Sequence, residues 1–523
     1  MLPYSSATVR FSDRLQLRLA NLDRRIEQHS SWTIALVLLF YLIRAICVSQ
    51  QTDLFIDEIL TYAHAQLPTL RSLWWTLTHA PAALDAPLHP FLSFFALRLP
   101  LPFPLSLRLP SILGYGAMML SIFAFLRRRV RTSVALLAAL IPMLIPLFQY
   151  AVQARPYALV LGFSGWALVF WQRATEQRSH RLGALIGLYF CITFALLAHY
   201  YAGVIFVPLV AGELWRTASQ RLDAAVWAVF AAASLTVLSY MPLLPTLIPY
   251  RAHPWVGVIP EDLWDTYLLA FSPVLLIVLG LCALLYLSRQ QNSARCPIDF
   301  PVYQQIALGA LLLVPFFVFD SAKVITHTYV PRYALPFSIA AAILLAIAIH
   351  ALTHHIPGSA SGIALALLLY ASIPIAHAWI DPSPQNTGGI DKKPIPILNR
   401  FPNLPIAITN FYDFGRIYLF GPDQVKRRMV LVSDPTAITD LGISDSLANE
   451  AVKHALRVPA ATSRTFLRSH PRFLLVGPYW LRDQALQQGR QIQFVGKLYN
   501  WDLYYVAGPG AAYSITESEV LVP

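Results

Sequence analysis

Long apolar segments separated by short polar connectors dominate the first three quarters of this chain. A helix needs about 20 apolar residues to cross a bilayer, and about eleven segments reach or approach that length. We expect membrane spans at residues 32–50, 107–126, 132–151, 156–172, 182–199, 202–215, 224–246, 267–287, 304–319, 332–351 and 360–379. The pattern predicts a polytopic α-helical membrane protein with about eleven transmembrane helices.

Basic residues gather in every second connector of this series. They lie at 127–131, 172–181, 215–221 and 288–295. Because Lys and Arg stay on the cytoplasmic side of a membrane, these connectors and the N-terminus are predicted to be cytoplasmic. An odd number of spans then places everything after residue 380 on the extracytoplasmic side.

The segment at 89–105 is apolar, but four prolines interrupt it. Counting it as a span would move the connector at 127–131 to the outside, against the charge rule. We therefore expect residues 51–106 to form a large first external loop of short helices lying against the outer leaflet. Residues 1–31 are polar and Arg-rich, which predicts a cytoplasmic amphipathic helix or, alternatively, an unstructured basic tail.

The pattern changes after the last apolar segment. Residues 381–400 carry the Pro and Gly of a linker. Residues 401–523 alternate short β-like runs with helical patterns, the clearest of which is 446–458. Residues 497–508 resemble a closing hairpin. The sequence thus predicts a small C-terminal extracytoplasmic α/β domain.

Composition agrees with a bilayer environment. The chain has 56% hydrophobic and 13% charged residues, whereas soluble domains carry about 25% charged residues. The net charge of +12 is not gathered on one polar face, which argues against nucleic-acid binding. Three of the four cysteines lie inside apolar segments and the fourth in a connector, so no disulfide framework is expected.

Two adjacent carboxylates stand out in the stretch "FIDEILTYAHA", just beyond the first span. They are Asp57 and Glu58, and after Asp85 no further acidic residue occurs until Glu176. A carboxylate partly buried at the outer interface can take a proton from a hydroxyl group. The structural alternative is that both residues stabilise the start of an interfacial helix.

Further polar residues fall on the predicted outer turns, where charge is costly and usually functional or paired. The candidates for substrate binding are His89, Arg155, Tyr157, His199, Tyr200, Arg251, Lys323, Arg332 and Tyr333. Two of them, Arg155 and Arg332, could instead extend toward lipid headgroups. His199 could be an ordinary hydrogen-bonded residue, and we interpret His350 and His354 as a cytoplasmic helix end without a third metal ligand.

No P-loop, Gly-x-Gly-x-x-Gly or Asp-x-Asp motif occurs, which argues against a soluble sugar nucleotide as the donor. We expect no cofactor and no metal site, although the missing motif does not decide whether a divalent ion takes part. Carboxylates and guanidinium groups at the outer mouth of an apolar domain suit a lipid-linked sugar phosphate. Arg would bind the phosphate as the leaving group, and Asp57 would deprotonate the acceptor.

These residues resemble the bacterial membrane glycosyltransferases of family 39, related to protein O-mannosyltransferases and the lipid A aminoarabinose transferase. The matching pieces are "FIDEILTYAHA", "APLHPFL", "LRLPSILGYG", "QARPYAL", "AHYYAG" and "PRYALPF", which follow the family order. The resemblance implies the C-type glycosyltransferase fold, a polyprenyl-phosphate-linked sugar donor, a catalytic acid at Asp57 and a place in the bacterial inner membrane. One departure is His89-Pro90-Phe91, where family members often have His-Pro-Pro.

Other functions remain open from the sequence. A polysaccharide or O-antigen-type ligase would also need outward Arg groups. A lipid-linked sugar flippase would place ionisable groups near mid-membrane, where Arg44 is the main example. A scaffold that binds partners through its external domain would leave the outer polar residues unexplained. The sugar, the acceptor (lipid, glycan or protein) and the oligomeric state are not determined by the sequence.

Overall fold

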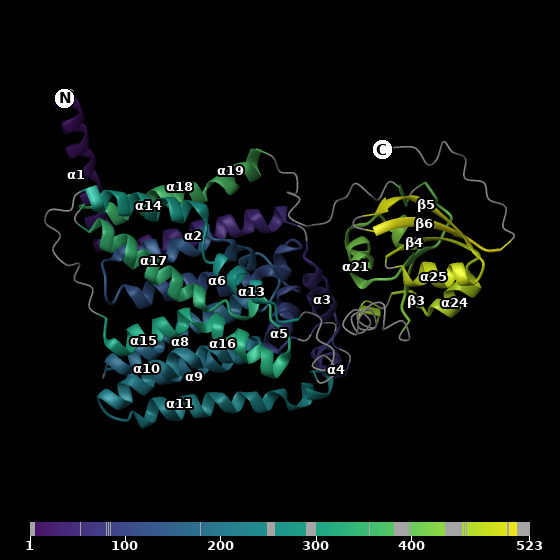
Figure 1. Ribbon diagram of the computed structural model, residues 1–523, viewed down its shortest axis with the longest axis horizontal. Coiled ribbons are helices and arrows are strands. Elements are labelled where there is room, and N and C mark those ends of the chain that lie inside the picture. The colour runs from purple at the N-terminus through teal and green to yellow at the C-terminus, as the bar shows by residue number, and fades with distance from the viewer. Residues whose placement is uncertain are drawn as a thin grey trace.

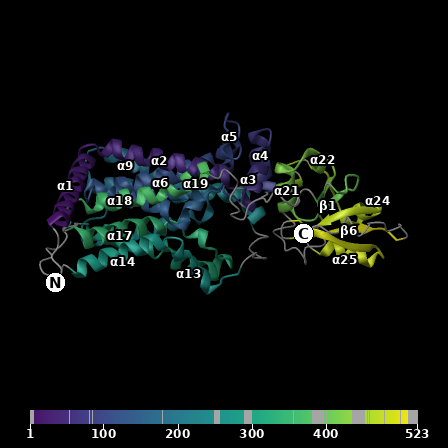
Figure 2. The ribbon, with the colours of Figure 1, turned by 90° about the horizontal axis from the view of Figure 1, so that it is seen from above.

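The computed structural model describes most of the chain. The described residues are 6–52, 54–79, 81, 83, 85–177, 179–247, 257–288, 300–354, 356–380, 397, 398, 400–434, 452, 453, 456, 458–477, 479–498 and 501–509. Long helices run side by side through one part of the molecule, and a β-sheet domain lies beyond one end of them (Figure 1). The N-terminal helix lies at the opposite end, and a second view gives the same separation (Figure 2).

Within the described residues, five helices are long and apolar enough to cross a membrane. They are Ser30–Gln51, Leu105–Leu126, Arg181–Ala198, Ala224–Leu247 and Ser359–His377. Two further pairs of consecutive helices pass the same test when each pair is counted as one span. The two helices of each pair meet at a short break, with bends of 68° and 49°. A multi-pass helical protein is therefore confirmed, while the count of eleven spans stays a prediction.

The helices of this part have the following bounds. They are α2 (Ser30–Gln51), α6 (Leu105–Leu126), α7 (Thr132–Leu140), η1 (Ile141–Leu144), η2 (Pro146–Ala151), α8 (Tyr157–Glu176), α9 (Arg181–Ala198), η3 (Tyr200–Ile205), α10 (Phe206–Ser219), α11 (Ala224–Ser234), η4 (Leu235–Leu243), α13 (Pro260–Leu268), α14 (Pro273–Ser288), α15 (Val302–Leu312), α16 (Val314–Ser321), η5 (Ala322–Thr326), η6 (Pro331–Tyr333), α17 (Phe337–Thr353), α18 (Ser359–Ala371) and α19 (Ile373–Ile380).

Several segments expected as single spans are broken. The segment expected at 132–151 ends its α-helix at Leu140 and continues as two 3-10 turns, with extended backbone at Ile145 before Pro146. Proline removes a helical hydrogen bond and clashes with the preceding turn. Polar side chains satisfy the freed carbonyls: Tyr115 donates to Pro142 O at 2.6 Å and Arg44 donates to Met143 O. Such breaks are tolerated at membrane depth only where protein or a cavity surrounds them.

Glycines let α6 and α8 approach each other closely. A Cβ on Gly114 would lie 2.7 Å from the carbonyl carbon of Ala158, and a Cβ on Gly162 would lie 2.5 Å from the carbonyl oxygen of Gly114. Small residues at helix contacts replace the hydrophobic driving force that is absent within a lipid bilayer. The first turn of α6 and the turn before α8 both contribute to the site described below.

The segment after α2 folds into three short helices. They are α3 (Ile56–Ala65), α4 (Leu70–His79) and α5 (Leu88–Ala96), which lie at the end of the helical part that faces the sheet domain (Figure 1). Trp74 and Trp75 of α4 are exposed, as expected for an interfacial helix. At the other end, α1 (Ser6–Gln28) is a helix rather than a tail, and Glu27 accepts a hydrogen bond from Thr132 N at 2.9 Å.

The C-terminal region forms a six-stranded sheet in the order β3-β2-β1-β4-β6-β5. The first four strands in that order are parallel, and β6 pairs antiparallel with both β4 and β5. Its elements are β1 (Ile406–Ile408), α21 (Phe411–Phe420), α22 (Asp423–Lys426), β2 (Met429–Val432), β3 (Ala460–Ala461), α24 (Ser463–Ser469), β4 (Arg472–Val476), α25 (Trp480–Gln487), β5 (Gln491–Leu498) and β6 (Trp501–Ala507). The expected helix at 446–458 lies largely outside the described residues.

Side chains of these strands alternate between two cores, as the period of two along a strand requires. Ile406 and Ile408 belong to a core shared with α3, α4 and α21, whereas Ala407 belongs to a second core shared with α24 and α25. One core therefore joins the sheet domain to the helices of the first loop.

We predict that Gly162→Ala lowers the melting temperature of the protein in detergent, followed by tryptophan fluorescence. The added methyl group meets a backbone oxygen that cannot rotate away, and overpacking of this kind costs about 1–3 kcal/mol. Gly280→Ala in α14 is the matched control, because a Cβ there meets nothing within 4 Å. Equal melting temperatures for the two variants would contradict the close packing of α6 on α8.

Candidate active site

The two adjacent carboxylates lie in the first turn of α3 and point to different partners. Asp57 forms an ion pair with Arg155, and its side chain is 29% exposed. Glu58 forms an ion pair with Arg108 at 2.8 Å, and both side chains are fully buried. Neighbouring residues of a helix project about 100° apart, so one carboxylate faces a partly open site and the other faces the protein interior.

Glu58 is held by four hydrogen bonds. Arg108 donates to its two oxygens at 2.8 and 2.9 Å. The backbone N–H of Phe55 donates to Oε2 at 2.7 Å and that of Ala154 donates to Oε1 at 2.6 Å. The bond from Phe55 N is the capping interaction expected for an acid at a helix start. These bonds occupy both carboxylate oxygens, which gives Glu58 a structural role in this geometry.

Arg108 is a site residue that the sequence analysis did not single out, although it lies within the quoted stretch "LRLPSILGYG". Besides Glu58, its guanidinium donates to Ser49 O at 2.6 Å and to Thr52 O at 2.8 Å. It therefore ties α6 to the end of α2 and the start of α3. The sequence did contain an indication of this role. An Arg in the first turn of an apolar span is costly to bury, and such a side chain usually has an ion-pair or hydrogen-bond partner.

Arg155 sits in the turn that precedes α8. The turn is fixed by Ser111 of α6, whose hydroxyl donates to Arg155 O at 2.8 Å. The guanidinium contacts Asp57, donates to Tyr157 Oη at 3.3 Å and lies 5.4 Å from the ring centroid of Phe55. Arg155 is thus buried with its charged end aimed at the half-exposed carboxylate.

An aromatic cluster continues from Arg155. The rings of Tyr157 and His199 lie 5.1 Å apart, and those of His199 and Tyr333 lie 5.7 Å apart. Tyr201 stacks on Tyr333 at 3.9 Å. The structure therefore brings together three turns that are far apart in the sequence, namely those before α8, after α9 and before α17.

His89 lies on α5 and is fully buried. Its Nδ1 has no hydrogen-bond partner among the described residues. Burial, together with the positive charge of Arg155, lowers the pKa of His89 to about 3. The ring is neutral at physiological pH, so His89 can accept or donate a hydrogen bond but adds no charge.

Asp85 supplies a second carboxyl group near Arg155. Burial raises its pKa to about 7; Arg155 opposes this shift and Asp57 reinforces it. Its backbone carbonyl accepts a hydrogen bond from Tyr200 Oη at 3.3 Å. The sequence places Asp85 in the same predicted external loop as His89, but the predicted site residues did not include it.

The remaining candidates are placed less centrally. Lys323 is exposed and pairs with Asp320 at 3.0 Å, and its described contacts do not reach the cluster. Arg332 is half-buried, with its guanidinium 5.9 Å from the ring centroid of Tyr333. Arg251 lies outside the described residues. Within the described part of the chain, no three His, Cys, Asp or Glu side chains are grouped to hold a metal ion.

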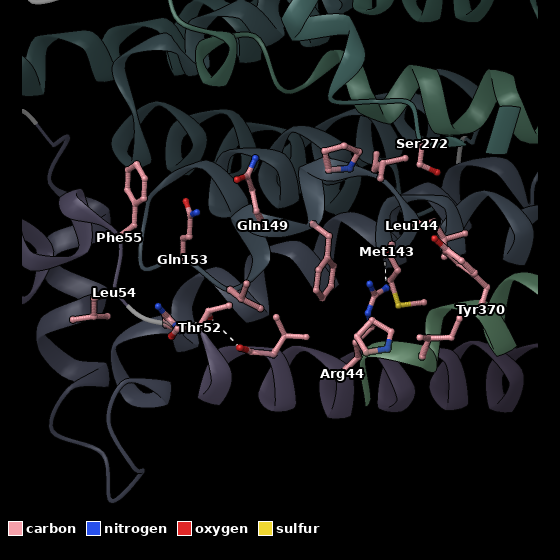
Figure 3. Close-up of a pocket in the computed structure, with 18 residues that line it drawn as sticks. Arg44, Thr52, Leu54, Phe55, Met143, Leu144, Gln149, Gln153, Ser272 and Tyr370 are labelled. Carbon is pink, nitrogen blue, oxygen red and sulfur yellow. Dashed lines mark hydrogen bonds between the residues drawn. The ribbon is translucent and has the colours of Figure 1, made fainter. Parts of the chain in front are cut away.

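A cavity of about 560 Å³ lies beside this site (Figure 3). Phe55 lines it at one end, near Thr52 and Gln153, and Arg44 lies further along α2. Because Arg44, Val48 and Thr52 are spaced by four residues, the cavity follows α2 for about 12 Å. Its walls are mostly apolar and include the helix break at Ile145.

Comparison with known proteins fits this geometry. Residues 79–245 match the family model described as dolichyl-phosphate-mannose-protein mannosyltransferase. No curated protein sequence matches the chain. The resemblance to family 39 is confirmed.

Two solved structures of one bacterial protein share the fold of this chain. ArnT from Cupriavidus metallidurans bound to undecaprenyl phosphate is 13% identical with a TM-score of 0.53, covering 91% of this chain and 98% of that chain. Its apo state is 12% identical with a TM-score of 0.53, covering 92% and 99%. The apo oligosaccharyltransferase of Archaeoglobus fulgidus is 13% identical with a TM-score of 0.45, covering 84% and 69%. The chain thus shares the C-type glycosyltransferase fold of ArnT.

We predict that Glu58→Gln lowers the melting temperature strongly, because it leaves the Arg108 guanidinium buried without a counter-charge. Breaking a buried ion pair from one side costs about 3–5 kcal/mol. Glu261→Gln, at an exposed position of α13, is the control and should melt like the wild type. If Glu58→Gln keeps the wild-type melting temperature but loses activity, Glu58 acts in the chemistry instead.

Proposed function

We propose that this protein is a membrane glycosyltransferase that moves a sugar from a polyprenyl-phosphate-linked donor to an extracytoplasmic acceptor. The ion pair between half-exposed Asp57 and buried Arg155, next to a cavity that follows a membrane span, carries the proposal. The likeness to a structure that holds undecaprenyl phosphate supports the donor class. The basic connectors, predicted to be cytoplasmic, support an extracytoplasmic position for this end of the helices at the bacterial inner membrane.

In the proposed reaction Asp57 is the general base. Its carboxylate takes the proton of the acceptor hydroxyl while the hydroxyl oxygen attacks the anomeric carbon of the sugar. The bond from that carbon to the phosphate oxygen breaks, and the electron pair leaves with polyprenyl phosphate. Attack from the side opposite the phosphate inverts the anomeric configuration.

Arg155 is proposed to bind the phosphate that leaves. Its guanidinium can make two parallel hydrogen bonds to phosphate oxygens, and it meets the growing negative charge in a site largely shielded from water. Without donor the same group is neutralised by Asp57. Donor binding would therefore draw Arg155 toward the phosphate and leave the Asp57 carboxylate more basic for proton transfer.

The aromatic cluster and the cavity fit the other parts of the donor. Tyr157, His199, Tyr333 and neutral His89 offer hydrogen bonds and ring faces for a sugar. The cavity beyond Phe55 offers an apolar path along α2 for the first isoprene units. Tyr200 holds the loop that carries Asp85. Arg332 and Arg251 remain proposed phosphate ligands, and Lys323 is proposed for the outer edge of the site.

A flippase for lipid-linked sugars is the second candidate. Broken helices and an ionisable group at membrane depth are typical of transporters, and the cavity wall contains the break at Ile145 together with Arg44. Transport of a fluorescent polyprenyl-phosphate sugar across proteoliposomes, without any sugar transfer, would favour this function over the first.

The donor and the acceptor can be identified together. We expect cells that lack this protein to accumulate one polyprenyl-phosphate-linked sugar and to lose one surface glycan, lipid or glycoprotein modification. Mass spectrometry of the lipid extract and of the surface fraction would measure both. An unchanged lipid-linked sugar pool would contradict the proposed function.

We predict that Asp57→Asn reduces sugar transfer in membranes by at least about 100-fold, because general-base catalysis contributes about 10²–10⁴-fold. Transfer would be measured with the donor that accumulates in the deletion cells. Asp265→Asn is the matched control, since Asp265 is exposed on α13 and is not one of the proposed site residues. Near wild-type transfer by Asp57→Asn would remove the proposed base.

We predict that Asp85 makes donor-phosphate binding sensitive to pH. Its pKa is raised to about 7, so the group is neutral below that pH and becomes a carboxylate above it. The added negative charge near Arg155 repels a phosphate, and the affinity for undecaprenyl phosphate should fall roughly threefold or more between pH 6 and pH 8, relative to Asp85→Asn. Dividing the wild-type affinity by the Asp85→Asn affinity at each pH removes the effect of the ionisation of undecaprenyl phosphate itself. Identical pH profiles for the two proteins would contradict the prediction.

A further inference from the structure

Helix α21 of the C-terminal domain packs beside the helix that carries Asp57. Helix α21 follows β1 directly, and the side chain of Asn410 caps it by accepting a hydrogen bond from Asp413 N at 2.8 Å. Phe414 and Ile417 of α21 are buried in the same core as Leu60 and Ala63 of α3. The helix that carries Asp57 is therefore packed against the C-terminal domain as well as against the membrane spans.

The two helices approach each other closely at Gly415. A Cβ on Gly415 would overlap the Cγ2 methyl group of Ile59. The two carbon atoms would lie closer together than real Cβ contacts allow. Ile59 is fully buried, and its Cγ2 is attached directly to Cβ, so it cannot swing away as the end of a long side chain could. A glycine is needed at this position for α21 to lie where it does.

A second contact connects α21 to the rest of the site. Leu419 packs against a small buried cluster whose four members are Leu54, Ala65, Leu107 and Ala154. Three of these four directly precede a site residue in the chain: they are followed by Phe55, Arg108 and Arg155. One side chain of the C-terminal domain thus packs against a cluster that contains the residues directly before Phe55, Arg108 and Arg155.

The contact between Gly415 and Ile59 affects Asp57 because of the directions in which the α3 side chains project. Residues two apart on a helix project about 200° apart, so the side chain of Ile59 points nearly opposite to that of Asp57. A displacement of Ile59 away from α21 would therefore move Asp57 relative to Arg155. The helix is held between α21 on one side and the Asp57–Arg155 ion pair on the other.

We propose that the C-terminal domain is a positioning element of the active site, and that Gly415 is its key positioning residue. The close fit of Gly415 on Ile59 sets the distance between Asp57 and the segment that carries Arg155. The inference rests on the proposed function, because it assigns a role in the same reaction. A catalytic group displaced by about 1 Å can lose about 100-fold in rate.

The test is Gly415→Ala. Alanine is the better helix former by about 1 kcal/mol, so α21 itself should not be weakened by the change. Gly309→Ala in α15 is the matched control, since a Cβ there meets nothing within 4 Å. Ile59→Leu is the rescue, because leucine keeps the volume of isoleucine but has no methyl group on Cβ.

We expect Gly415→Ala to lower kcat for sugar transfer at least about tenfold, with the affinity for undecaprenyl phosphate changed less than about twofold. Gly415→Ala combined with Ile59→Leu should recover most of the lost kcat, while Gly309→Ala should match the wild type. A Gly415→Ala protein with wild-type kcat would overturn the proposal. So would a loss that the double variant does not recover.

Hydrogen exchange gives a readout that does not depend on activity. Amides of α3 should exchange several-fold faster in Gly415→Ala than in the wild type and return to the wild-type rate in the double variant. Unchanged exchange in α3 would overturn the coupling between the two helices. If the wild type transfers no sugar but α3 responds in this way, the proposed reaction fails and the mechanical coupling stands.

Discussion

The site depends on giving each of two adjacent carboxylates its own guanidinium group. A buried charge is tolerated only when it is paired and hydrogen-bonded. Glu58 and Arg108 meet this condition completely, and their pairing fixes the ends of α2, α3 and α6 relative to one another. Because that buried pair holds the helix start, the neighbouring Asp57 is free to face a partly open site with Arg155.

The segments around Asp57 and Arg155 would not be stable as isolated secondary structure. Short helices, 3-10 turns and a broken span leave backbone groups that must find partners in an apolar environment. Tyr115 and Arg44 satisfy carbonyls of η1, and Ser111 fixes the turn of Arg155. These bonds permit irregular backbone beside the cavity, where regular helices would have left no space for a ligand.

The C-terminal domain belongs to the same arrangement. Its sheet has the alternating cores of an independent α/β unit, but one of the two cores is completed by helices of the first loop. The contact between Gly415 and Ile59 lies on the face of α3 opposite Asp57. Support from both sides of α3 explains how a ten-residue helix at a membrane interface can hold a carboxylate in one place.

The sequence by itself determined the class of fold and indicated candidate residues of the site. Apolar length predicted a multi-pass helical part, short β-like runs predicted the strands of the C-terminal domain, and rare charges on predicted outer turns indicated Asp57 and Arg155. Only the tertiary structure decided that Asp57, and not Glu58, faces the open site. It also decided that Lys323 is turned to an exposed partner and that Arg108 is essential to the framework. The physical reason is that periodicity is local, whereas the partner of a buried charge can lie 50 residues away, as Arg108 does from Glu58.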